Sequence, residues 1–294
     1  MTTRAWPAEL LPPPVLGHTR VVGVIGWPVE HSVSPPMHNA ALRALGLEWC
    51  YLPFPVRPEG LAEALRGARA LGVRGLNVTV PHKQASLALM DALTPAARAI
   101  GAVNTVSFED DRALGHNTDA EGFLSALAAV GCDPRGCDAL VLGAGGAARA
   151  VVYALAGAGA RLTLLNRTPE RAAALAAELA PGAAVAPLDA ASLRRYSPGA
   201  ALVVNTTPLG MWPHAEGTPW PAEVAFPGGA LCYDLVYNPR ETRLMRLART
   251  AGAAASDGLG MLVHQGAAAL RLWTGLAPPV AAMFAACTHV LGGS

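Results

Sequence analysis

The spacing of apolar residues alternates along the chain between the two-residue period of strands and the longer period of helices. In the first part of the chain it predicts strands over 21–25, 51–56, 75–80 and 102–108, and helices from Ser34, over 61–70 and over 83–93. Ser34 before Pro35 is typical of a helix start with serine as the N-cap. Asp110 and Asp111 indicate a turn. Because strands and helices alternate, we expect a mainly parallel sheet.

The periodicity breaks around 131–136, after a helix that is predicted from Asp119 to about residue 130. A second alternating series then starts, with predicted strands over 139–142, 162–165, 201–205 and 230–236 and helices over 147–156, 170–179 and 241–251. Two further helices, over 259–273 and 280–290, carry wide uncharged faces. We expect them to pack back on the first domain, which would make that domain discontinuous in sequence.

Composition narrows the classes of function. The net charge is only +1, which gives no reason to expect a nucleic-acid or anionic-membrane partner. With 52% apolar residues the chain can bury a large core. The five cysteines are odd in number and lack the spacing of a metal site, so we expect a reduced, cytoplasmic setting and no bound metal. Residues 1–19 are predicted to form a Pro-rich surface arm without a signal peptide, and no segment is predicted to span a membrane.

A glycine-rich motif, residues 143–148, follows an apolar strand and opens an Ala-rich helix. Its order Gly-Ala-Gly-Gly-Ala-Ala fits the G-x-G-x-x-A fingerprint of a Rossmann-type dinucleotide site, where backbone N–H groups at the helix start bind a pyrophosphate. A plain tight turn, or another kind of adenosine site, is the alternative. The strand that follows ends in Asn166 instead of the carboxylate that holds the ribose of NAD. Arg167, Thr168 and Arg171 suit a 2′-phosphate, so we predict NADP, although Thr168 also fits a helix N-cap.

Polar side chains gather where the strands of the first domain end. Ser32 and Ser34 could hold a carboxylate at a helix N-terminus, although Ser34 alone more often acts as a cap. Asn77 and Thr79 project to the same side of a strand. Lys83 is expected in the first turn of a helix, where the helix dipole disfavours a cation, and this conflict points to function as much as to a surface lysine.

Lys83 and Asp119 form a candidate proton-transfer pair. Taken singly, Asp119 is a helix N-cap and Lys83 a surface residue. Together an ammonium and a carboxylate could donate and accept a proton beside a carbonyl that is being reduced.

The ordered motifs of the chain resemble those of shikimate dehydrogenases from about residue 21 to about residue 273. The matching segments are 32–35, 77–83, 101–105, 117–119, 143–148, 166–168, 205–211, 233–237 and 257–265. The resemblance implies NADP-linked reduction of 3-dehydroshikimate to shikimate, on the route to aromatic amino acids. It also implies an active site in a cleft between an N-terminal α/β substrate domain and a Rossmann-type NADP domain.

The same resemblance assigns roles residue by residue. Lys83 and Asp119 would be the catalytic pair. The residues that would bind substrate are Ser32, Ser34, Asn77, Thr79, Asn104, Tyr237 and Gln265. The residues that would bind NADP are Gly143, Ala144, Gly145, Gly146, Ala147, Asn166, Arg167, Thr168, Arg171, Leu235 and Gly258. The substrate domain would comprise 20–118 with about 259–290, and the NADP domain 119–258. The chain departs from many relatives at 94–97, which lacks an acidic residue, and at Gln84.

Three rival functions are kept open. One is a relative that acts on quinate or an aminated shikimate. The second is a methylene-tetrahydrofolate dehydrogenase, against which the Ser-x-Ser and Asn-Thr-Asp motifs speak. The third is an NADP-binding sensor without catalysis, against which Lys83 and Asp119 speak. The only expected partner is a small-molecule substrate, and the sequence leaves a homodimer open.

Overall fold

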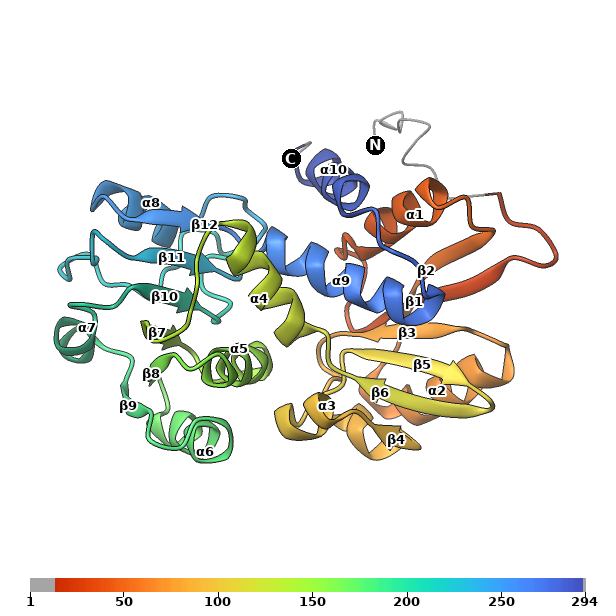
Figure 1. The fold of residues 1–294 in the computed structure, drawn as a ribbon, viewed down its shortest axis with the longest axis horizontal. Coiled ribbons are helices and arrows are strands. Elements are labelled where there is room, and N and C mark those ends of the chain that lie inside the picture. The colour runs from red at the N-terminus through yellow and green to blue at the C-terminus, as the bar shows by residue number, and fades with distance from the viewer. Residues whose placement is uncertain (1–13, 293–294) are drawn as a thin grey trace. The chain divides into compact units, whose positions relative to one another are not determined.

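The computed structural model describes residues 14–292, so the first thirteen residues of the predicted arm lie outside the described part. The described chain divides into two compact units (Figure 1). Unit 1 contains residues 14–118 and 263–292, and unit 2 contains residues 119–262. The predicted α/β class is confirmed, because each unit combines one sheet with helices. No helix of residues 14–292 is long and apolar enough to cross a membrane.

Unit 1 holds a six-stranded sheet in the order β2-β1-β3-β5-β6-β4. Its strands are β1 (Arg20–Gly26), β2 (Trp49–Pro55), β3 (Gly75–Val78), β4 (Ala92–Leu93), β5 (Thr105–Glu109) and β6 (Arg112–His116). Its helices are α1 (Ser34–Ala44), α2 (Leu61–Ala70), α3 (Pro95–Ile100), the larger part of α9 (Leu259–Thr274) and α10 (Val280–Leu291). β1 pairs in parallel with β2 and β3, whereas β5 runs antiparallel to β3 and β6. The expected mainly parallel sheet therefore carries an antiparallel hairpin, whose turn places Asp110 and Asp111 at positive φ.

Two predictions for unit 1 are wrong in detail. The helix expected over 83–93 is a short 3₁₀ segment, Ala85–Leu89, followed by strand β4. Lys83 lies in the preceding turn, so the expected conflict with a helix dipole does not arise. Ser34 is the first residue of α1 and its N-cap is Val33, because helical geometry begins one residue earlier than expected.

Unit 2 is a fully parallel six-stranded sheet in the order β12-β11-β10-β7-β8-β9. Numbered within the unit this is 6-5-4-1-2-3, the strand order of the Rossmann fold. The strands are β7 (Asp138–Leu142), β8 (Arg161–Asn166), β9 (Ala184–Pro187), β10 (Leu202–Asn205), β11 (Leu231–Asp234) and β12 (Ala254–Ser256). The helices are α4 (Asp119–Ala129), α5 (Gly146–Gly157), α6 (Pro169–Leu179), α7 (Ala190–Tyr196) and α8 (Arg243–Thr250), with α9 beginning in this unit. Five of these helices were predicted; β9, α7 and β12 were not.

The core of unit 1 depends on its C-terminal helices. The indole Nε1 of Trp273 in α9 donates to the Val106 carbonyl at 3.0 Å. A Cβ at Gly75 would lie 2.1 Å from that indole, so only glycine fits beneath it. The expected packing of the last helices on the first part of the chain is thus confirmed: Trp273 of α9 covers β3 and β5, and α10 packs on α1.

His38 should make unit 1 sensitive to acid. Its ring is fully buried, neither nitrogen has a hydrogen-bond partner in the described part, and burial lowers its pKa from 6.5 to about 3. The unfolded chain gains this proton near pH 6.5 and the folded chain only near pH 3, so stability present above pH 6.5 is lost as the pH falls through this window. We expect this histidine to remove about 2 kcal/mol between pH 8 and pH 5.

The His38→Leu variant isolates this effect. The free energy of unfolding of each protein is measured in urea at pH 8 and at pH 5. Its decrease between these pH values should be about 2 kcal/mol smaller for the variant than for the wild type. Equal pH dependence of the two proteins would show that His38 is not the acid-sensitive group.

Candidate active site

Ser32 and Ser34 lie together at the start of α1. The Ser32 Oγ accepts the backbone N–H of Ser34 at 3.2 Å. Ser32, and not the predicted N-cap Ser34, therefore supplies the side-chain oxygen that accepts a backbone N–H at the start of this helix. Pro35 and Pro36 occupy the first turn, where their missing N–H groups leave no helical bond unmade. The hydrogen of the Ser32 hydroxyl is not used in this bond and can point to a ligand.

Asn77 is fixed at the end of β3 by buried partners. Its Oδ1 accepts the phenol O–H of Tyr51 at 2.8 Å, and its Nδ2 donates to the Thr105 hydroxyl at 3.1 Å. The same Nδ2 reaches the Asn104 carbonyl at 3.4 Å. With both amide hydrogens taken up by the protein, Asn77 offers a ligand only the second lone pair of Oδ1. It is therefore suited to accept a hydrogen bond from a hydroxyl.

Asn104 connects three further side chains. Its Nδ2 donates to the Thr118 hydroxyl at 2.9 Å and to Gln265 Oε1 at 3.3 Å. Its Oδ1 accepts the Thr118 backbone N–H at 2.7 Å and the Thr105 hydroxyl at 3.1 Å. The structure thus brings together Asn104 and Gln265, which are 161 residues apart in sequence.

Lys83 is anchored beside this group by its backbone. The Val103 N–H donates to the Lys83 carbonyl at 2.8 Å, and Val103 precedes Asn104. Asp119 follows Thr118, whose N–H and hydroxyl are bonded to Asn104. Adjacent Cα atoms are about 3.8 Å apart, so Asp119 lies one peptide unit from Thr118 of the Asn104 cluster. Lys83 is connected less directly, through the hydrogen bond from Val103, the residue before Asn104.

One sequence signal strengthens the case for Lys83. It is the only lysine of the 294 residues, whereas arginine supplies the remaining 21 of the 22 basic residues. A chain that otherwise uses arginine throughout keeps lysine where a compact ammonium able to release a proton would be needed, and arginine cannot release one near neutral pH.

The glycine-rich loop has the geometry that a pyrophosphate requires. Gly143 has φ +109, and a Cβ there would lie 2.5 Å from the Thr206 hydroxyl. Gly145 is the N-cap of α5 without a side-chain hydrogen bond, so it leaves the first N–H groups of the helix open. A Cβ at Gly145 or Gly146 would meet nothing within 4 Å. The residues present therefore fit a dinucleotide, with Ala144 and Ala147 completing the loop.

A pair of alanine variants separates the two roles of these glycines. Gly143→Ala is expected to lose about 1–3 kcal/mol of stability because of the positive φ and the contact with Thr206. Gly145→Ala should keep or raise the stability by up to about 1 kcal/mol, yet weaken NADP⁺ binding at least about tenfold, because the methyl group fills the space that a phosphate must approach. Thermal unfolding and NADP⁺ titration by calorimetry measure both quantities. Unchanged NADP⁺ affinity of Gly145→Ala would place the pyrophosphate elsewhere.

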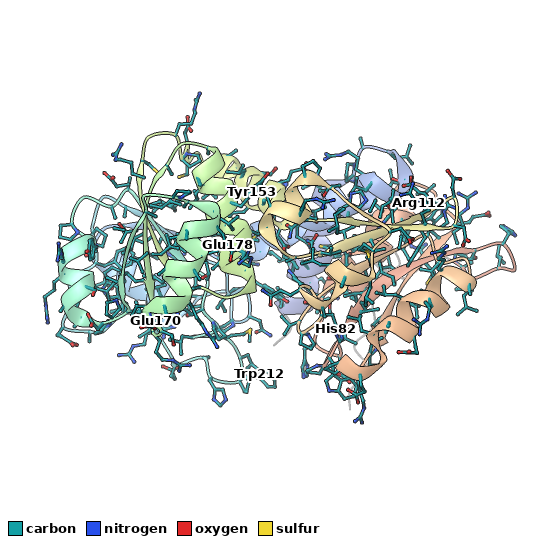
Figure 2. All side chains as sticks on the ribbon, turned by 90° about the horizontal axis from the view of Figure 1, so that it is seen from below. His82, Arg112, Tyr153, Glu170, Glu178 and Trp212 are labelled. Atoms are coloured by element: carbon teal, nitrogen blue, oxygen red, sulfur yellow. The ribbon has the colours of Figure 1, made fainter. Side chains whose placement is uncertain are left out.

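The end of β8 presents positive charge. Arg167, Thr168 and Arg171 are exposed, and neither arginine has an ion-pair partner in the described part of the chain. The Asn166 side-chain amide donates to the Thr168 carbonyl at 2.8 Å. Thr168 is the N-cap residue of α6 and Pro169 its first residue, as predicted, but the Thr168 side chain makes no capping hydrogen bond. The acidic residues of α6, Glu170 and Glu178, are labelled in Figure 2.

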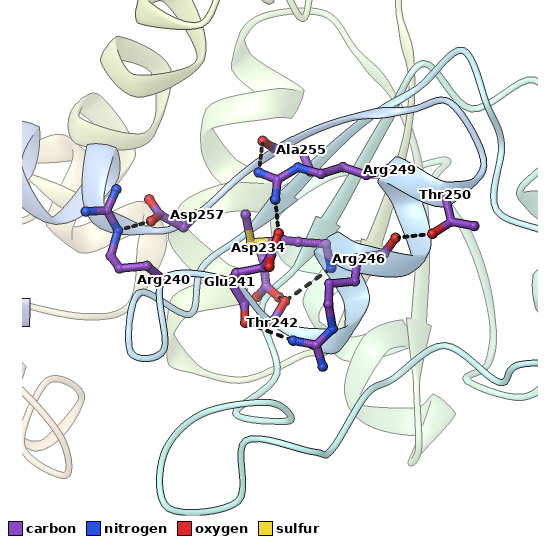
Figure 3. A network of polar contacts seen from close by, with 10 residues as sticks. Asp234, Arg240, Glu241, Thr242, Arg246, Arg249, Thr250, Ala255 and Asp257 are labelled. Atoms are coloured by element: carbon purple, nitrogen blue, oxygen red, sulfur yellow. Dashed lines mark hydrogen bonds and ion pairs between the residues drawn. The ribbon is translucent and has the colours of Figure 1, made fainter. Parts of the chain in front are cut away.

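Leu235 and Gly258 lie in direct contact. The Gly258 N–H donates to the Val236 carbonyl at 3.0 Å, and a Cβ at Gly258 would lie 2.0 Å from the Leu235 carbonyl oxygen. Next to Gly258, Asp257 pairs with Arg240 and accepts the Leu259 N–H at 3.1 Å (Figure 3). This network fixes the start of α9 against the end of β11.

Asp234 secures the other side of this region. Its carboxylate accepts from Asn205 Nδ2 at 2.8 Å and from the Thr242 hydroxyl at 2.6 Å. Burial raises the pKa of Asp234, and these hydrogen bonds oppose the rise. The buried carboxylate thus ties β10 and β11 to α8. Tyr237 lies on the loop after β11, next to Asn238, whose carbonyl accepts the N–H of the exposed Trp212 at 2.9 Å (Figure 2).

Sequence reasoning missed Tyr51, and it quoted Thr105 and Thr118 without a role. The sequence Trp-Cys-Tyr of β2 does not show whether the tyrosine hydroxyl makes a polar contact or whether the ring only fills the core. Thr79 is placed directly after β3, where its methyl group packs against Gly26. In unit 1 the hydroxyl of Thr105 joins Asn77 to Asn104, and Asn104 is bonded to Gln265. Ser34 is bonded through its backbone N–H to Ser32.

A Rossmann sheet with an open glycine loop and a polar group beside the single lysine define a nucleotide-dependent oxidoreductase. Family models match the chain for the shikimate dehydrogenase substrate binding domain over 24–106, shikimate / quinate 5-dehydrogenase over 126–207 and the shikimate 5′-dehydrogenase C-terminal domain over 258–287. A shikimate dehydrogenase (NADP(+)) of Moorella thermoacetica is 51% identical, with 95% of this chain and 96% of that protein covered. The chain belongs to the shikimate dehydrogenase family.

Two solved structures show how closely the fold is shared. The crystal structure of shikimate 5-dehydrogenase from Thermus thermophilus in complex with NADP(H) and shikimate has a TM-score of 0.86 at 45% identity, covering 93% of this chain and 100% of that one. Quinate dehydrogenase from Corynebacterium glutamicum in complex with NAD has a TM-score of 0.83 at 36% identity, covering 91% and 98%. The family relationship disfavours the tetrahydrofolate rival.

Proposed function

We propose that this chain catalyses the reversible, NADPH-dependent reduction of 3-dehydroshikimate to shikimate, a step in the biosynthesis of aromatic amino acids. The observation that carries the proposal is the polar group of unit 1, in which Asn77, Asn104 and Gln265 are held beside the anchored Lys83. A ring bearing several hydroxyls and one carboxylate needs such a set of neutral donors and acceptors. The relative in Moorella thermoacetica carries the same activity in its name.

We assign substrate binding to residues 20–118 with 259–290, and NADP binding to residues 119–258. Ser32 and Ser34 would hold the carboxylate, and Asn77, Thr79, Asn104, Tyr237 and Gln265 the ring and its hydroxyls. The loop from Gly143 to Ala147 would hold the pyrophosphate, the segment from Asn166 to Arg171 the 2′-phosphate side, and Leu235 and Gly258 the nicotinamide.

The roles of Lys83 and Asp119 follow from the charge that the reaction develops. When bound, the nicotinamide supplies the hydride that reduces the ring ketone. Negative charge then grows on the ketone oxygen, and the Lys83 ammonium stabilises this oxygen and gives it a proton. To the Asp119 carboxylate we assign the role of orienting Lys83 and a substrate hydroxyl. In the oxidative direction Lys83 takes the proton back.

The choice between shikimate and quinate is the open alternative, since a quinate dehydrogenase shares the fold. The exposed Arg167 and Arg171 favour NADP over the NAD of that structure. The test is the rate of NADP⁺ reduction with shikimate, measured beside quinate and beside NAD⁺. Turnover with shikimate and NADP⁺ alone supports the proposal. Binding of NADP⁺ without turnover would point to a sensor instead.

We further propose the cytoplasm as the compartment, because all five cysteines are free thiols in the structure. The compartment in which a fluorescent fusion of the full chain accumulates tests this. The homodimer is tested by the mass of the protein in solution.

A further inference from the structure

Tyr51 fixes one polar side chain of the substrate site from outside that site. Its phenol donates to Asn77 Oδ1 at 2.8 Å. In the proposed function Asn77 contacts the ring of the substrate. Burial raises the pKa of Tyr51, with the Ser34 hydroxyl opposing the rise, so the phenol keeps the proton that it donates.

Both the backbone and the ring of Tyr51 are held by neighbouring side chains. Asn39 accepts the Tyr51 backbone N–H and donates to the Tyr51 carbonyl, both at 2.9 Å. The His38 ring stacks on the phenol with a centroid distance of 4.2 Å and an interplanar angle of 0°. Trp273 lies on the same cluster, with its ring centroid 6.3 Å from that of Tyr51. A hydroxyl on so rigid a ring has a fixed position.

Thr105 continues the connection on the far side of Asn77. Its fully buried hydroxyl accepts from Asn77 Nδ2 at 3.1 Å and donates to Asn104 Oδ1 at 3.1 Å. Side-chain hydrogen bonds therefore run without a break from Tyr51 through Asn77 and Thr105 to Asn104. From Asn104 they reach Gln265 at 3.3 Å.

We propose that Tyr51 is a positioning residue of the substrate site, which fixes the Asn77 Oδ1 acceptor before shikimate binds. The inference rests on the proposed function. Tyr51 touches neither substrate nor cofactor in this scheme; it acts by removing the rotamer freedom that Asn77 would otherwise lose on binding. Tyr51 keeps its bond to Asn77 in the bound state, where the second lone pair of Oδ1 accepts a substrate hydroxyl.

The test is Tyr51→Phe, which deletes the hydroxyl and keeps the stacked ring. We expect the KM for shikimate to rise about 3- to 10-fold, the effect of one hydrogen bond, with kcat changed less than about 2-fold and the KM for NADP⁺ unchanged. Thr105→Val should act in the same direction, and Thr105→Ser, which keeps the hydroxyl, should restore the wild-type KM. Thermal unfolding of each variant checks that the fold is retained.

Tyr233→Phe is the matched control. Tyr233 is also fully buried, and its hydroxyl accepts the Met261 N–H at 3.2 Å in unit 2. It should lose stability similarly but leave the KM for shikimate unchanged. Two results would contradict the positioning role, provided that the wild type turns over shikimate. One is a wild-type KM for shikimate in Tyr51→Phe. The other is a fall in kcat and a rise in KM for both substrates that follow the loss of stability. If the wild type itself fails to turn over shikimate, the proposed function fails first.

Discussion

Replacing Lys83 with alanine is expected to lower kcat by about 10²–10⁴-fold, the usual contribution of a positioned acid or base. The KM for shikimate should change much less, because the neutral side chains around Asn77 and Asn104 still bind the ring. Steady-state rates with shikimate and NADP⁺ give both constants. A near-normal kcat in this variant would remove Lys83 from the mechanism.

Lys83→Arg is the matched control for charge. Arginine keeps a cation for the developing oxyanion but holds its proton at any working pH. If Lys83 transfers a proton, the arginine variant stays far below the wild type. If charge alone matters, it recovers most of the rate. Acylation gives an independent check, since the chain has no other lysine and Lys83 and the amino terminus are therefore its only primary aliphatic amines. Loss of activity should follow modification of the Lys83 peptide in a mass spectrum.

Replacing both Arg167 and Arg171 with serine is expected to shift the cofactor preference from NADPH towards NADH by about 10²-fold or more. Each arginine would donate charge-assisted hydrogen bonds to the 2′-phosphate, worth about 1.5–3 kcal/mol each, and NADH lacks that phosphate. The measurement is the ratio of kcat/KM with NADPH to that with NADH. The KM for NADH itself should stay close to its wild-type value.

The control for this variant removes two other exposed arginines of unit 2. Arg194 and Arg195 lie on α7, away from the end of β8 in sequence, and their replacement changes the net charge equally. This control should keep the NADPH preference. An unchanged preference in the Arg167 and Arg171 variant would mean that the 2′-phosphate is bound elsewhere.

The fold was predictable where hydrophobic periodicity is long and uninterrupted. The range of α2, Leu61–Ala70, was predicted to the residue, and the Rossmann unit followed from alternating strands around one glycine motif. The misses are short or polar elements. The segment after Lys83 has helical spacing of its apolar residues but forms only a 3₁₀ turn, because Ala92 and Leu93 pair with β6 as strand β4. Pairing with a strand that is distant in sequence cannot be predicted from the local spacing of apolar residues.

The site divides in the same way. Residues in compact motifs, such as Asn77 and Lys83, could be identified because several polar types stand together at a strand end. Tyr51 could not, because its partner Asn77 lies on another element and its neighbours in β2 are apolar. The orientation of Asn104 also needed the structure, since Gln265 reaches it from α9, 161 residues further along the chain.

The order in which the chain is synthesised gives the C-terminal helices a further consequence. Unit 2 is continuous in sequence, so it can fold while the polypeptide is still leaving the ribosome. Unit 1 cannot, because α10 packs on α1, and a Cβ at Gly266 would touch both Met37 and Met283. Unit 1 is therefore the first to be synthesised and the last to be completed. The surfaces of β3, β5 and α1 that α9 and α10 cover stay exposed, and accessible to other chains, until these two helices have been synthesised.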